Sequence, residues 1–176
     1  MEEKLTVSDT VKKWGLIYGI VGLIYMLLST MLDFATMGMM VQVISFLVLV
    51  GIAFTIYFLA CKEYRDSNEG QISFGRAFGI IALVAVIGGV IRAIGIYAYI
   101  KFIDTGYMAR VQEAQEEMRS RFGAPEVDTD DLPAFVKFFQ TEEFLGIATF
   151  FNVMIGALII GLIVAAMVQK KEDHSY

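Results

Sequence analysis

Residues 74–100 read FGRAFGIIALVAVIGGVIRAIGIYAYI, an apolar run in which Arg76 and Arg92 are the only charged residues. A helix rises about 1.5 Å per residue, so roughly 20 apolar residues cross a hydrocarbon core of about 30 Å. The run is long enough to do so. Hydrocarbon offers no partner for an unpaired backbone N–H or C=O, so the run is expected to be helical throughout.

Three further apolar blocks accompany this run, and the charged residues gather between the blocks. The predicted spans are residues 14–33, 39–61, 74–100 and 144–168. The chain is 57% hydrophobic, above the roughly 45–50% of soluble domains, and its mean hydropathy is +0.63. These features predict an all-α membrane protein. Residues 1–176 would form one domain of four transmembrane helices, arranged as two hairpins.

The positive charges between the blocks predict the orientation of the spans. Short cytoplasmic flanks carry an excess of Lys and Arg. Such residues flank the first span on its N-terminal side, fill the connection between spans two and three, and follow span four, whereas the turn between spans one and two has none. Both termini are therefore expected in the cytoplasm, and residues 102–143 form an extracytoplasmic loop. The residues concerned are Lys4, Lys12, Lys13, Lys62, Arg65, Arg76, Lys170 and Lys171.

Glycines recur at helical spacing in the first and third spans. Residues 14–20 and 74–80 both read aromatic-Gly-x-x-aromatic-Gly-Ile, which could reflect a parallel repeat of two hairpins. Small residues four apart let two helix backbones approach closely. The candidate helix-packing residues are Gly15, Gly19, Gly75, Gly79, Gly88 and Gly95.

The loop at residues 102–143 has helical periodicity of its own. An apolar stripe at i, i+4, i+7, i+11 and i+15 predicts an amphipathic helix that Asp104 caps at its start and that Gly123 ends. A shorter element is expected over residues 128–140, and Thr141 is expected to cap span four. The loop could fold over the outer mouth of the bundle, pack on a partner, or lie on the membrane surface. The stripe is Tyr107, Val111, Ala114, Met118 and Phe122.

Arg92 is the most unusual residue in the spans, because a charge near the middle of a bilayer costs at least about 2.5–3.5 kcal/mol. One interpretation is an intramembrane charge pair of Arg92 with Asp33 at the outer end of span one. The other is a buried anion or proton site, formed by Arg92 with a tyrosine such as Tyr25 or Tyr97. The sequence leaves both open.

Other chemistries find little support in the residues. The chain has one cysteine, Cys61, and one histidine, His174, which lies in the C-terminal tail. No internal disulfide and no cysteine-based metal site can form, and a His-based site would have to use the tail. The formal net charge of −5 argues against nucleic-acid binding. We therefore expect no catalytic, metal-binding or cofactor-binding residues and no enzymatic activity.

Three segments carry a family resemblance. The run from Ile72 to Phe78, the run from Ile96 to Asp104, and the Glu/Met/Arg-rich segment from Met108 to Phe122 together resemble bacterial four-helix membrane proteins classed as domain of unknown function 4199. The resemblance covers nearly the whole chain. It implies a bacterial inner-membrane location and no established activity.

Two classes of function fit these features. The first is a structural or accessory subunit that acts through helix packing and its external loop, with membrane lipids and a membrane-protein partner or a second copy as contacts. The alternative is a small oligomeric transporter or channel with Arg92 in an anion or proton pathway.

Overall fold

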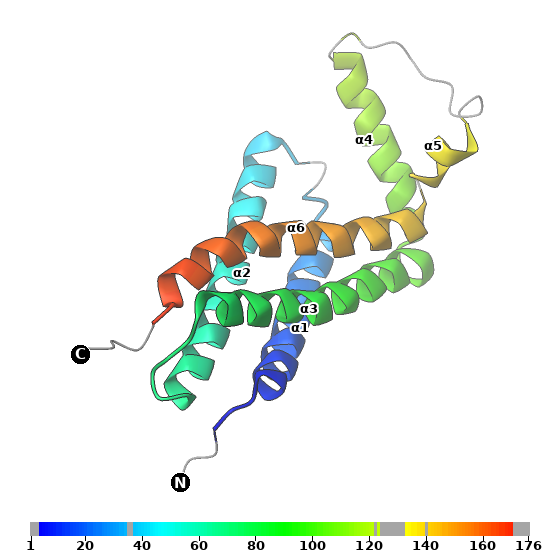
Figure 1. Cartoon of the computed structure of the whole chain (residues 1–176). Coiled ribbons are helices and arrows are strands. Elements are labelled where there is room, and N and C mark those ends of the chain that lie inside the picture. The colour runs from blue at the N-terminus through cyan, green and yellow to red at the C-terminus, as the bar shows by residue number, and fades with distance from the viewer. Residues whose placement is uncertain (1–3, 35–36, 122, 124–132, 140, 171–176) are drawn as a thin grey trace.

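The computed structural model describes residues 4–34, 37–121, 123, 133–139 and 141–170. Within these residues the regular secondary structure is helical, and one isolated antiparallel bridge joins Ile72 and Lys170. Figure 1 shows the helices in order: α1 (Val7–Met31), α2 (Met39–Ser67), α3 (Phe74–Phe102), α4 (Tyr107–Arg121), α5 (Ala134–Phe138) and α6 (Glu142–Val168). The four helices α1, α2, α3 and α6 are long and apolar enough to cross a membrane. This confirms the predicted all-α class and indicates a multi-pass membrane protein.

Side-chain caps set the starts of three long helices. The Thr6 side chain accepts a hydrogen bond from the backbone N–H of Asp9, and the Asp9 carboxylate accepts one from the backbone N–H of Thr6, which completes a capping box. This cap explains why α1 begins well before the apolar residues of the first span. Ser73 caps α3, and Thr141 caps α6 by accepting from the N–H of Phe144 at 3.2 Å.

The helices α1 and α2 run in opposite directions, and so do α3 and α6. Near the start of α1, the Trp14 indole N–H donates to Glu63 near the end of α2. Near the end of α1, the Tyr25 hydroxyl lies 2.7 Å from the Ser45 hydroxyl near the start of α2. In the same way α3 and α6 are joined by Lys101 and Glu143 at one end, at 3.0 Å, and by the bridge from Ile72 to Lys170 at the other.

Helices α1 and α3 run parallel and pack closely through glycines. A Cβ at Gly15 would lie 2.8 Å from Ile87 Cβ, and a Cβ at Gly19 would lie 2.6 Å from Ile91 Cδ1. A helix pair can approach this closely only where no side chain stands between the backbones. Since α3 also packs along α6, it has buried residues on nearly its whole length, from Ala77 to Ile100.

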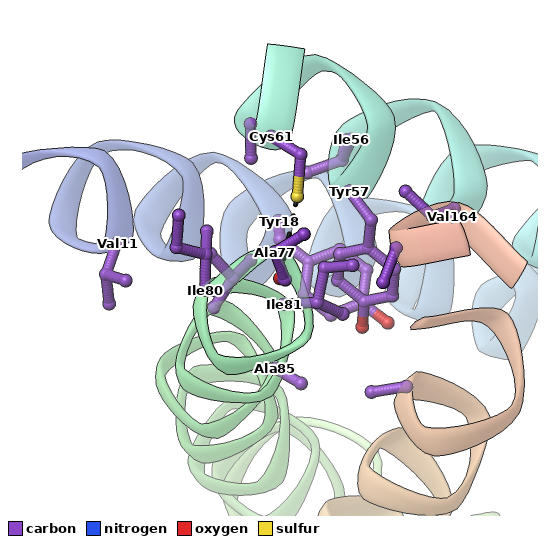
Figure 2. Packing of buried hydrophobic residues seen from close by; sticks show 14 of the residues in the cluster. Val11, Tyr18, Ile56, Tyr57, Cys61, Ala77, Ile80, Ile81, Ala85 and Val164 are labelled. Carbon is purple, nitrogen blue, oxygen red and sulfur yellow. Dashed lines mark hydrogen bonds between the residues drawn. The ribbon is translucent and has the colours of Figure 1, made fainter. Parts of the chain in front are cut away.

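The core lies where α2 packs against α1, α3 and α6. Figure 2 shows Tyr18 of α1 and Tyr57 of α2 with their rings side by side among apolar side chains of α3 and α6. The ring centroids are 5.0 Å apart. The Cys61 thiol is fully buried here and faces the Ala77 carbonyl at 3.6 Å. The core is thus mostly apolar, and the phenol groups of Tyr18 and Tyr57 point the same way within it.

The loop after α3 forms α4 and α5, which lie beyond the end of the molecule where α3 finishes and α6 begins (Figure 1). Asp104 lies just before the start of α4, where its carboxylate binds Arg110 through both oxygens and also accepts a hydrogen bond from the backbone N–H of Gly106. Gly123 has a φ of +67°, which suits its predicted role in ending the helix. The second loop element is described only over residues 133–139. The side chains of Met118 and Phe122 in the predicted stripe lie outside the described residues.

Candidate functional site at a buried arginine

Arg92 lies on α3 beside α1 and is only 5% exposed. It stands 18 residues after the start of a helix that runs from Phe74 to Phe102, so it falls well inside the apolar part of the helix. The side chain of a helical residue leans toward the N-terminus of its own helix. The guanidinium therefore points toward the middle of the molecule.

A glycine on α1 makes room for this side chain. A Cβ at position 22 would lie 2.8 Å from Arg92 Cδ, 3.1 Å from Nε and 3.3 Å from Cζ. Any residue larger than glycine would therefore overlap Cδ of the arginine and crowd its Nε and Cζ. Gly22 is thus the wall against which the guanidinium lies.

The described partner of the guanidinium is a tyrosine. Arg92 Nη1 donates to the Tyr18 hydroxyl at 3.4 Å, and Arg92 Cζ lies 5.8 Å from the centroid of the Tyr18 ring. A cation held near an aromatic face gains about 0.5–2 kcal/mol, with more when the pair is desolvated. Tyr18 in turn packs on Tyr57, which is completely buried. Three helices therefore contribute one polar group each to this position.

Two polar atoms at this position are sealed from solvent, the Nε of Arg92 and the hydroxyl of Tyr57. The Tyr57 hydroxyl shares a hydrogen bond with Tyr18, whereas Arg92 Nε has no hydrogen-bond partner among the described residues. None of the ion pairs formed in the described part of the chain involves Arg92. A buried donor without an acceptor costs about 1–3 kcal/mol, and more when it is charged.

The expected pair of Arg92 with Asp33 is not formed. Asp33 lies 11 residues beyond Gly22, about 16 Å along the helix direction at 1.5 Å per residue, and it pairs with Arg110 of α4. The physical reason is the lean of the side chain: α1 and α3 run parallel, so Arg92 reaches back toward Tyr18 and away from the end that carries Asp33.

The two tyrosines proposed from the sequence as partners of Arg92 contact other residues. Tyr25 bonds Ser45 on α2, and Tyr97 lies under the ammonium group of Lys101, at 5.0 Å from its ring centroid. Tyr18 was the companion that sequence reasoning missed, together with Gly22 and Tyr57. The sequence does contain a signal for Tyr18, since it precedes Gly19 in the aromatic-glycine motif.

The six candidate helix-packing glycines divide into two groups. A Cβ at Gly88 would lie 2.4 Å from the Tyr18 ring, and one at Gly95 would lie 2.4 Å from Leu23, so these glycines pack against α1. Gly15 and Gly19 pack against α3, as described above. At Gly75 and Gly79, a Cβ would meet no other atom within 4 Å. The two similar motifs therefore do not face each other.

An ion cluster lies at the end of the molecule that carries α4. Arg110 binds Asp104 through both Nη atoms, at 3.1 and 2.7 Å, and its Nε lies 3.4 Å from Asp33. These hydrogen bonds hold the pKa of Asp104 below its ordinary value and raise the pKa of Arg110. Burial raises the pKa of Tyr107. The first turn of α4 is thus tied to the ends of α1 and α3.

A cleft of about 380 Å³ lies between α1 and α2 beside this cluster, and Tyr107 of α4 forms part of its wall. Several of its polar lining groups are already engaged, for example Tyr25 with Ser45 and Ser29 with the Tyr25 carbonyl. In the described part of the chain no group of three His, Cys, Asp or Glu side chains could hold a metal ion. Arg92 is therefore the strongest candidate for a functional residue.

Comparison with known proteins supplies a family and no activity. No curated protein and no solved structure matches the chain. The model of the family described as protein of unknown function (DUF4199) matches residues 13–170. This confirms the resemblance seen in the sequence, and the chain belongs to the DUF4199 family.

Proposed function

We propose that this protein is an accessory membrane subunit that binds another membrane helix through the outward face of α3. The observation that carries the proposal is the contrast among its glycines. Gly75 and Gly79 leave the α3 backbone open on its first two turns, whereas Gly88 and Gly95 on the same helix are filled by α1. Phe74 is 37% exposed beside them, and it stacks on Phe78 with an interplanar angle of 2°. A glycine pair beside aromatic side chains suits close packing of a further helix.

The proposal includes the topology expected from the sequence: two hairpins in a bacterial inner membrane, with both termini cytoplasmic. The contact of Lys4 with Glu69 and the bridge from Ile72 to Lys170 support it, because they gather at one end of the molecule most of the basic residues that flank the spans. A single cysteine introduced at Ser8 should react with a membrane-impermeant maleimide only in inverted vesicles. One introduced at Ser120 should react only in right-side-out spheroplasts, and the reverse pattern would overturn the orientation.

Substitution tests the partner surface. Gly75→Leu with Gly79→Leu should abolish association, because a leucine stands where the partner backbone would lie. Gly51→Leu with Gly156→Leu is the matched control, since these glycines also have open space around them but lie on α2 and α6. The readout is native mass spectrometry of the protein extracted in mild detergent.

The expected result is a stoichiometric companion, or a second copy, that the α3 double variant loses and the control retains. A wild-type protein recovered only as a monomer, with no stoichiometric companion, would contradict the proposal.

A second candidate function is an oligomeric transporter or channel with Arg92 in an anion pathway. The specific observation in its favour is a buried cation that no described carboxylate neutralises. Chloride or nitrate efflux from proteoliposomes, lost in Arg92→Leu, would support it. Efflux equal to that of empty liposomes would remove it.

A further inference from the structure

We propose that Arg92 binds a small monatomic anion of the halide class inside the helix bundle, with the hydroxyls of Tyr18 and Tyr57 as further donors. The inference deepens the second candidate function by naming its ligand. The experiment measures binding of the anion and not its flux, so the ligand proposal and the transport proposal can fail separately.

The hydrogen-bond donors around Arg92 indicate which kind of ligand fits there. An arginine side chain only donates hydrogen bonds, and a tyrosine hydroxyl can donate one. The Tyr18 hydroxyl accepts from Arg92 Nη1 and shares a hydrogen bond with Tyr57, which uses one of the two hydroxyl protons and leaves the other to donate. Arg92 Nε has no partner among the described residues. The group therefore offers several donors and one positive charge, and what complements it is an acceptor with a negative charge.

The charge of Arg92 also favours an anion. An ionised group without a counter-charge is far more costly in a low-dielectric interior than in water. The aromatic contact of Arg92 with Tyr18 offsets only part of this cost. Asp33, the carboxylate that follows the end of α1, is engaged by Arg110. A bound anion would neutralise the guanidinium where the chain itself does not.

Burial limits the size of the anion. Arg92 is 5% exposed, Tyr18 4% and Tyr57 0%, so an anion reaches the donors only when the surrounding side chains move. Sulfate and phosphate are larger and, carrying more charge, are harder to dehydrate than a halide. A single-atom anion demands the least displacement and the least desolvation.

Gly22 shows that the position of the guanidinium depends on its surroundings. A methyl group there would overlap Arg92 Cδ, at 2.8 Å, and crowd Nε. Gly22→Ala thus moves the guanidinium without removing any charge or hydroxyl. It offers a test that is independent of deleting the arginine.

The experiment is chloride-35 NMR line broadening with the full-length protein in phosphatidylcholine nanodiscs. Sodium chloride is titrated against sodium gluconate at constant ionic strength, and bromide is then added as a competitor. The expected result is saturable broadening that bromide reverses. Arg92→Leu should weaken binding by about ten-fold or more, the range expected for a charged hydrogen-bond donor, and Tyr57→Phe by about three- to ten-fold.

Arg76→Leu is the matched control. Arg76 lies on the same helix and also donates to a tyrosine, Tyr64, at 3.3 Å, but it stands near the helix start and is exposed. This variant should bind chloride as the wild type does. Broadening in the wild type no greater than in Arg92→Leu, or equal losses in Arg76→Leu and Arg92→Leu, would overturn the proposal. If Arg92→Leu does not fold, the variants Tyr57→Phe and Gly22→Ala test the proposal instead. Wild-type chloride affinity in both variants would also overturn the proposal.

Discussion

Replacing Gly88 by alanine should destabilise the protein more than its small size suggests. The new Cβ would lie 2.4 Å from Cδ1 of the Tyr18 ring and 3.2 Å from the backbone nitrogen of Gly19. An ordinary contact begins near 3.4 Å, so the ring would have to move by about 1 Å. It is not free to do so, because Tyr57 packs on it at 5.0 Å between centroids and Arg92 donates to its hydroxyl.

Extra atoms forced into a packed core typically cost about 1–3 kcal/mol. Here a ring and a backbone atom both resist the new methyl group, so we expect a loss in the free energy of unfolding of roughly 2–3 kcal/mol. The assay is reversible unfolding by sodium dodecyl sulfate in mixed micelles, followed by the fluorescence of Trp14, the only tryptophan in the chain. Trp14 lies at the α1–α2 contact and reports their separation.

Gly51→Ala provides the comparison, because nothing lies within 4 Å of a Cβ at that position. Alanine favours the helix over glycine by up to about 1 kcal/mol, so this variant should be neutral or slightly more stable. Equal stabilities for Gly88→Ala and Gly51→Ala would refute the reasoning, since the two differ chiefly in what the methyl group meets.

Three further predictions concern polar contacts. Tyr18→Phe removes the described acceptor of Arg92 and should lower the free energy of unfolding by about 1–3 kcal/mol in the same assay; an unchanged value would show that the bond contributes nothing. Asp104 has a lowered pKa, so its bond to Arg110 should stabilise the start of α4 above the ordinary carboxyl pKa of 3.8 and weaken as the pH falls below that value. Amide hydrogen exchange in α4 should accelerate there, and Asp104→Asn should remove the acid-induced change. Thr141→Ala deletes the cap of α6 and should cost about 1 kcal/mol, with faster exchange confined to the first turn of that helix.

Much of the fold follows from patterns that act locally along the chain. The apolar run at residues 74–100 needs a helix to satisfy its backbone in hydrocarbon, whatever surrounds it. Thr141 precedes two glutamates and an apolar run, and it caps α6 as that order predicts. Caps and spans depend on neighbours within one turn or one run, which is why they can be recognised without coordinates.

The site depends on the register between helices, which no local pattern encodes. Gly15 lies against Ile87 and Gly19 against Ile91, an offset of 72 residues between α1 and α3, whereas the similar motifs are 60 residues apart. A shift of 12 residues is about 18 Å along a helix. The motif therefore indicates which residues are small enough to pack, but not which partner they meet.

The apolar runs, the caps and the basic flanks are properties of single segments. They specify four apolar helices and predict the orientation of these helices in the membrane before any two helices touch. The surroundings of Arg92 are a property of three helices at once. Its side chain leans toward the start of α3, Gly22 leaves the space, and the parallel course of α1 brings Tyr18 rather than Asp33 to the guanidinium. Side-chain direction and helix register together select the partner of a buried charge, and these exist only once the helices have packed.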